Sequence, residues 1–98
     1  MRQVTSEQIC EWFNSDATDD FSAREVIVIR IIANSYDESL GMANVTSEIV
    51  VEQSGYSLRT VQAAINDLRK RAGWKIFYGK GSTVIRAVPF FASKANLA

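Results

Sequence analysis

Apolar residues recur at helical spacing near the start of the chain. Ile9 and Trp12 lie three positions apart, on one face of a helix. Thr5 and Gln8 stand at the spacing of a capping box, in which each side chain accepts a hydrogen bond from the other residue's backbone. We therefore predict a first helix over residues 5–14, which the acidic, turn-rich segment after it brings to an end.

A second capping box, formed by Ser22 and Glu25, precedes the most apolar part of the chain. Residues 26–29 are all β-branched, and this composition also suits a strand. The capping box, and an apolar stretch longer than an ordinary strand, favour a helix instead. We predict this second helix over residues 22–35.

The middle of the chain has the pattern of two helices joined by a tight turn. Residues 36–44 form a polar connection, and Val45 belongs at most to a very short strand. A short helix is predicted over residues 47–53, and Gly55 supplies the positive φ that a helix end commonly needs. Ser57 then caps the next helix. Two helices separated by a short turn with a glycine form a helix-turn-helix unit.

Beyond Gly73, which is predicted to close that helix, the hydrophobic pattern alternates. Residues 74–78 and 83–88 are predicted strands, and the glycine-rich residues 79–82 between them are a hairpin turn. The predicted fold class is α+β, mainly α, with a helical core followed by a two-stranded hairpin. A chain of 98 residues suits a single domain, which we divide into a helical extension (1–20), a core (21–88) and a tail (89–98).

Residue types that most enzymes need are scarce. The chain has no histidine and one cysteine, which excludes a Ser-His-Asp triad, a Cys-His pair and a zinc site of the usual ligands. Residues 79–81 are too short for a phosphate-binding loop. We expect no enzymatic activity, metal, cofactor or small-molecule ligand. Cys10 is predicted to be a buried, inert thiol.

The chain shows no sign of a membrane or secretory destination. Its longest apolar run, residues 26–29, ends at Arg30 and is far too short for a membrane span. The amino terminus lacks the apolar segment of a signal peptide. We expect a cytoplasmic protein with no membrane partner.

A net charge of zero conceals a strong asymmetry between the two halves of the chain. Residues 1–52 contain ten acidic and three basic residues, a net charge of −7. Residues 53–98 contain eight basic residues and one acidic residue, Asp67, a net charge of +7. Such a basic half suits a nucleic-acid partner.

The helix that begins after Ser57 is predicted to bury one side, because successive residues lie about 100° apart around its axis. The buried side holds Leu58 at its edge and then Val61, Ala64, Ile65, Leu68 and Ala72. The opposite, exposed stripe holds Arg59, Gln62, Ala63, Asn66 and Lys70. Arginine bonds bidentately to guanine, asparagine or glutamine to adenine, and alanine meets a thymine methyl group. Phosphate contacts are predicted at both ends of the helix, from Ser57, Thr60, Lys70 and Arg71.

These patterns together resemble the winged helix-turn-helix family, over about residues 21–88. The matching pieces are FSAR at 21–24, TSEI at 46–49, GYSLRTV at 55–61 and GKGS at 79–82. The resemblance implies that the helix from Ser57 to about Ala72 enters the major groove of DNA. It also implies that the loop with Lys80 and Ser82, the wing, contacts the backbone or the minor groove.

The sequence thus predicts a sequence-specific double-stranded DNA-binding protein associated with the nucleoid. Its expected role is that of a small transcriptional regulator or replication-associated factor of a bacterium, phage or plasmid. The alternative is a protein-interaction module, in which the acidic half of one copy docks head to tail on the basic half of the next. A homodimer formed through the first helix, with Trp12 and Phe13, is a further possibility beside packing of that helix on its own domain. A weaker alternative is RNA, with unpaired bases stacked on Tyr56, Phe77 or Tyr78.

Overall fold

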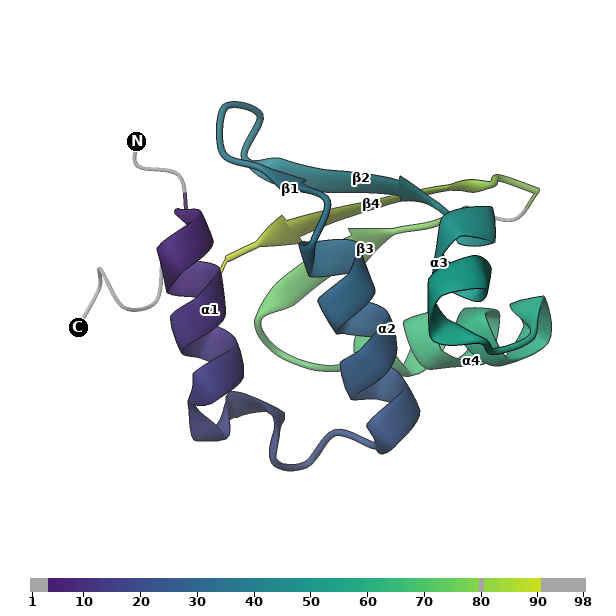
Figure 1. Cartoon of the computed structure of the whole chain (residues 1–98), viewed down its shortest axis with the longest axis horizontal. Coiled ribbons are helices and arrows are strands. Elements are labelled where there is room, and N and C mark those ends of the chain that lie inside the picture. The colour runs from purple at the N-terminus through teal and green to yellow at the C-terminus, as the bar shows by residue number, and fades with distance from the viewer. Residues whose placement is uncertain (1–3, 80, 91–98) are drawn as a thin grey trace.

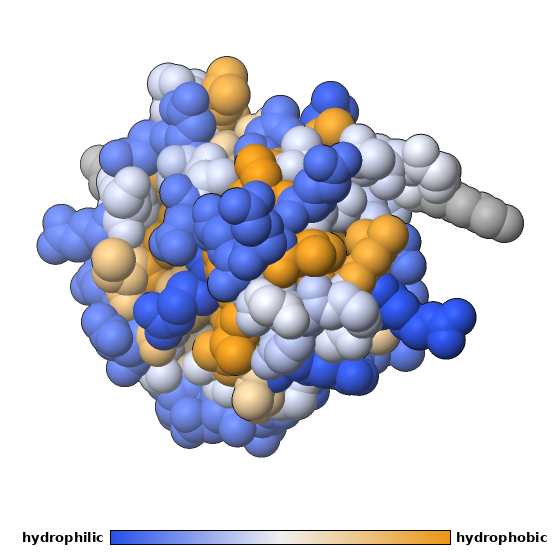
Figure 2. Space-filling view, turned by 45° about the vertical axis from the view of Figure 1, so that its right-hand side comes forward, coloured by the Kyte–Doolittle hydropathy of each residue, from blue (hydrophilic) through white to orange (hydrophobic). Residues whose placement is uncertain are grey.

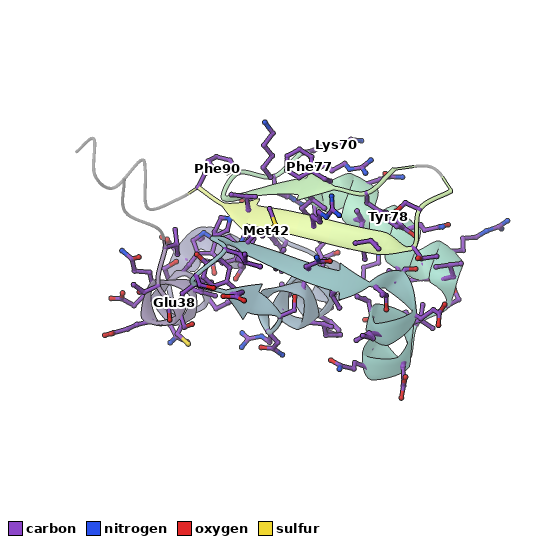
Figure 3. All side chains as sticks on the ribbon, turned by 90° about the horizontal axis from the view of Figure 1, so that it is seen from above. Glu38, Met42, Lys70, Phe77, Tyr78 and Phe90 are labelled. Atoms are coloured by element: carbon purple, nitrogen blue, oxygen red, sulfur yellow. The ribbon has the colours of Figure 1, made fainter. Side chains whose placement is uncertain are left out.

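Helices cover one face of a four-stranded antiparallel sheet, and no helix of the described residues covers the other face (Figures 1 and 3). The computed structural model describes residues 4–79 and 81–90. The predicted α+β class is confirmed. In chain order the elements are α1 (Ser6–Asn14), the 3-10 turn η1 (Asp16–Thr18), α2 (Ala23–Ala33), β1 (Tyr36–Asp37), β2 (Met42–Thr46), α3 (Ser47–Ser54), α4 (Leu58–Leu68), β3 (Trp74–Phe77) and β4 (Val84–Pro89).

The sheet has the strand order β1-β2-β4-β3, so β4 lies in the interior between β2 and β3. Val45 of β2 pairs with Ile85 of β4, and Ile76 of β3 pairs with Ala87 of the same strand. The helix pair α3–α4 thus leaves the sheet after β2, and the chain returns to it through the β3–β4 hairpin (Figure 1).

The predicted polar connection over residues 36–44 is wrong, because this segment folds as a β1–β2 hairpin. The strand β2 is five residues long, rather than the very short strand expected at Val45. Its inward positions, Ala43 and Val45, are buried, whereas Asn44 between them is exposed. A small residue facing the core gave too weak an alternation to reveal the strand from the sequence.

The predicted helix starts are confirmed. The Thr5 and Ser22 side chains each accept a hydrogen bond from the backbone three residues on, and both capping boxes are complete. The β-branched segment is a helix, as the second box favours. Gly55 ends α3 with φ 77°, and the Ser57 side chain caps α4.

The helix α4 ends at Leu68, several residues before the predicted end at Gly73. Lys70 and Arg71 continue as tight turns, in which their backbone amides bond to the carbonyls of residues 67 and 68. Ala72 is therefore exposed instead of buried, contrary to the prediction. Beyond the end of the helix, the Arg71 side chain bonds to α2, as described below.

The helix α1 packs against its own domain. Trp12 is buried, and its ring lies edge to face with that of Trp74, with 6.2 Å between the ring centroids. Phe13 is half-buried beneath the Arg30 guanidinium, which lies 4.6 Å from its ring centroid. The prediction of a buried thiol is wrong, because Cys10 lies on the exposed side of α1.

The described residues contain no helix with the length and apolar character needed to span a bilayer. The hydrophobic core lies between the helices and the inner face of the sheet. Its fully buried side chains of largest volume are Val28, Ile29, Ile32, Val50, Val61, Ile65 and Ile85.

Candidate nucleic-acid interface

The helix α4 divides into a buried side and a polar side, as predicted. Val61, Ala64 and Ile65 are fully buried, and Leu68 is nearly so. The exposed side chains on the other side are Arg59, Gln62 and Asn66, and the small Ala63 is half-buried among them. Leu58, at the edge, is 48% exposed. Figure 2 shows that hydrophilic side chains cover most of the side of the molecule that carries α3 and α4, with apolar patches between them.

The hydroxyl groups at the start of α4 bond to each other and to the helix. The Ser57 hydroxyl accepts a hydrogen bond from the Thr60 backbone amide at 3.2 Å and donates one to the Thr60 hydroxyl at 3.0 Å. These contacts fix the first turn of the helix. The predicted phosphate contacts of Ser57 and Thr60 stay predictions.

Arg71 is bonded within the domain, and its predicted phosphate contact stays a prediction. Its Nε atom donates to Glu25 Oε2 at 2.8 Å, and its terminal nitrogen donates to Glu25 Oε1 at 3.2 Å. The same nitrogen donates to the Asp20 carbonyl at 3.0 Å, and the guanidinium lies 5.0 Å from the Phe21 ring centroid. Arg71 therefore holds the start of α2 to the segment after α4.

Arg69 is a residue of this surface that sequence reasoning missed. Its guanidinium donates to the Tyr78 carbonyl, where β3 ends, and to the Asn66 side-chain oxygen at 3.3 Å. The Gln62 amide also reaches the Tyr78 hydroxyl, at 3.5 Å. Side chains of α4 thus hold the base of the β3–β4 hairpin in place. No local pattern identifies Arg69, because the contact depends on where the hairpin comes to lie.

A groove of about 310 Å³ separates the polar side of α4 from the hairpin. Its lining residues are Gln62 and Asn66 of α4, Arg69 just after the helix, and Tyr78, Gly79, Gly81 and Ser82 of the hairpin. Three of the predicted site residues, Gln62, Asn66 and Ser82, therefore meet around one depression. The Ser82 hydroxyl also accepts a hydrogen bond from the Val84 amide at 3.1 Å, which shapes the turn. Lys80 lies outside the described residues.

Two ion pairs join the acidic and basic halves within one chain. Arg24 lies 3.3 Å from Asp67, the one acidic residue of the basic half, and Glu25 pairs with Arg71. Arg24 offsets the charge of Asp67 on α4, and the exposed Arg59, Arg69 and Lys70 carry positive charge on this helix and just beyond its end. Among residues 4–79 and 81–90, no group of three or more acidic or cysteine side chains is placed to hold a metal ion.

Comparisons of the chain with models of known protein families, with curated protein sequences and with solved structures gave no match.

Replacing Arg69 with methionine should loosen the hairpin. The methionine keeps the aliphatic stem but removes the donors to the Tyr78 carbonyl and to Asn66. We expect faster hydrogen exchange at the Ser82 and Val84 amides, by roughly 5- to 10-fold, because a charge-assisted hydrogen bond at an exposed site contributes modestly. Arg59→Met removes a charge from the same helix without touching the hairpin, and should leave these amides unchanged. Equal exchange rates in Arg69→Met and the unaltered protein would contradict the role given to Arg69.

Proposed function

We propose that this domain is a winged helix-turn-helix protein that binds double-stranded DNA. In this proposal α3 and α4 are the helix-turn-helix pair, α4 is the helix that enters the major groove, and the β3–β4 hairpin is the wing. The observation that carries the proposal is the groove between α4 and the hairpin, where amide and guanidinium groups converge. The order of elements, a strand before the helix pair and a hairpin after it, supports the same assignment.

The chemistry of the exposed α4 side chains suits the edges of base pairs. Asn66 and Gln62 carry both a donor and an acceptor, the combination that recognises adenine, and Arg59 can bond bidentately to guanine. The half-buried Ala63 permits close approach of the helix to the groove floor. Lys70, exposed beyond the end of α4, is placed for a phosphate contact, and Lys80 has that role by its position in the sequence.

The role proposed for the whole protein is a small transcriptional regulator or a replication-associated factor acting at the nucleoid. Self-association through the opposite charges of the two halves stays a prediction. The ion pairs Arg24–Asp67 and Glu25–Arg71 already use part of that opposite charge inside one molecule.

Substitutions in the stripe should separate base recognition from charge attraction. With Asn66→Ala, we expect the ratio of affinities for the preferred and a mutated duplex to fall by about 5- to 150-fold, since a good base contact discriminates by about 1–3 kcal/mol. With Lys70→Ala, all duplexes should weaken alike, and the slope of log affinity against log salt should become shallower by about one unit. The preferred duplex is first obtained by selection from a random pool, and affinities are measured by fluorescence anisotropy across a salt series. An equal loss on every duplex for both variants would exclude direct base recognition by Asn66.

A further inference from the structure

The outer face of the sheet has no helix of the described residues over it, and Figure 3 shows this face with Phe77 and Met42 upon it. Phe77 is 49% exposed, whereas Trp74 and Ile76, which face the core from the same strand, are buried. The exposed position follows from the alternation of β3, which points Lys75 and Phe77 outward together. A single exposed aromatic ring is common on protein surfaces, so what distinguishes Phe77 is the set of side chains around it.

Cationic and polar side chains surround this ring. Phe77 pairs with Arg86 of β4, and Arg86 pairs in turn with Asn44 of β2, so the three side chains form one row across the sheet. Neighbouring side chains in such a row are about 5 Å apart. The Lys75 ammonium lies 5.5 Å from the Phe77 ring centroid. Strands β3 and β4 contain two basic residues and no acidic residue.

The row opens into a second hollow at the base of the hairpin, of about 270 Å³. Its lining includes Phe77, Val84 and Arg86 on the sheet, and Tyr78, Gly79 and Ser82 on the hairpin. Tyr78, Gly79 and Ser82 also line the groove beside α4. The hairpin therefore stands between two depressions, one facing α4 and one facing the open sheet.

We propose that this outer sheet face binds single-stranded nucleic acid, a function beyond the proposed reading of duplex DNA by α4. Unpaired bases expose both faces of their rings, so one base stacks on Phe77, whereas the bases of a duplex already stack on each other. Arg86 and Lys75 neutralise the phosphates on either side of that base. The combination of an aromatic ring with cations suits a polyanion with flat apolar groups, and a single strand offers both, whereas the bases of a duplex are already stacked on each other.

The charge of the surrounding surface fits a strand that runs across β4 and β3. The acidic residue nearest in the sheet, Asp37, lies on β1 at the opposite edge from β3. Tyr56 and Tyr78, the other aromatic residues with a possible stacking role, are half-buried. Phe77 is therefore the described aromatic side chain of this face that is most open to a base.

The test is binding of the full chain to labelled oligothymidine and oligouridine of about twelve nucleotides, within the range of single-strand site sizes, measured by fluorescence anisotropy. We expect Phe77→Ala to weaken binding by about 5- to 150-fold, the range that loss of one stacked base predicts. Phe77→Trp should retain binding, because the indole also stacks.

Arg86→Gln should weaken binding and make the slope of log affinity against log salt shallower by about 0.7, the value for one phosphate contact on a single strand. Tighter binding of oligouridine than of oligothymidine would identify RNA as the natural strand, and the reverse would identify DNA.

Leu40→Ala is the matched control, since Leu40 is 62% exposed at the tip of the β1–β2 hairpin, away from the row. This variant should bind the oligomers as the unaltered protein does. Asn66→Ala should also bind them normally, and Phe77→Ala should keep its duplex affinity, so failure of one proposal is distinguishable from failure of the other. The proposal is overturned if the unaltered protein does not bind either oligomer, or if Phe77→Ala and Leu40→Ala bind equally well. The protein could instead self-associate through this face, in a way that Phe77→Ala abolishes, and bind neither oligonucleotide. That result would make the face a protein interface and would also overturn the proposal.

Discussion

Replacing Glu25 with glutamine should destabilise the protein at neutral pH and make its stability depend less on pH in the acid range. The Glu25 carboxylate is buried, and its pKa is lowered from 4.5 to about 2, chiefly by its bonds to the Arg71 guanidinium. Burial opposes this shift by raising the pKa, and hydrogen bonds from Ser22 contribute to lowering it. A carboxylate with a lowered pKa stabilises the folded state above its unfolded pKa, and this contribution is lost as the pH falls toward the folded pKa.

The pH window follows from these two values. Stability from Glu25 is complete above about pH 5 and declines between about pH 4.5 and pH 2. Allowing for solvent around the partly exposed Arg71, we expect a contribution of about 2 kcal/mol at neutral pH. In Glu25→Gln the amide oxygen can still accept the bond from the Ser22 amide, so the cap persists while the charge is lost.

Urea unfolding at pH 7, 4 and 2.5 would measure this effect. Glu25→Gln should be less stable than the unaltered protein at pH 7, and the difference should be much smaller at pH 2.5. Glu11→Gln, at an exposed position on α1, is the control and should follow the unaltered protein throughout. A difference between Glu25→Gln and the unaltered protein that is the same at all three pH values would show that the carboxylate charge is not responsible.

Replacing Gly73 with alanine should destabilise the fold by about 2–4 kcal/mol. Gly73 has φ 112°, a backbone conformation that side chains strongly disfavour. A Cβ atom there would lie 2.9 Å from Cζ2 of Trp12. The indole cannot move aside easily, because it packs edge to face against Phe21 and Trp74. Both the backbone and the packing therefore oppose the new methyl group.

Gly55→Ala separates the two causes. Gly55 also has a positive φ, 77°, but a methyl group added there would have no described atom within 4 Å beyond its chain neighbours. Only the backbone cost of about 1 kcal/mol therefore applies. Urea unfolding of both variants at neutral pH gives the comparison. If the two variants lost equal stability, the close approach of Trp12 to Gly73 would not be the reason that glycine is needed.

The elements that were predicted correctly from the sequence are those with local signals. Capping boxes determine the starts of α1 and α2, and Gly55 with Ser57 determines the turn between α3 and α4. The features that were missed depend on contacts between distant parts of the chain. The hairpin over β1 and β2 forms because β2 pairs with β4, and nothing within residues 36–46 indicates that partner.

The candidate site likewise combines features with local signals and features that depend on distant contacts. The polar side of α4 follows from helical periodicity, and Gln62 and Asn66 lie where it places them. Arg71 belongs to the basic run in the sequence, yet its place is decided by a carboxylate on α2. Arg69 acquires its role from the hairpin carbonyl that it meets. The charge pattern of the sequence therefore indicates which half of the chain is basic, but not which arginines bond within the domain.

The pairing of β2 with β4 brings the start of α3 close to the residue that precedes β4. The Ser47 amide, where α3 begins, donates to the Thr83 carbonyl at 2.8 Å, where the hairpin returns to the sheet. The segment between these two residues also supplies the edge strand β3 and the fully buried side chains of Val61 and Ile65. A change in the length of this segment must therefore preserve its two anchored ends and its share of the core.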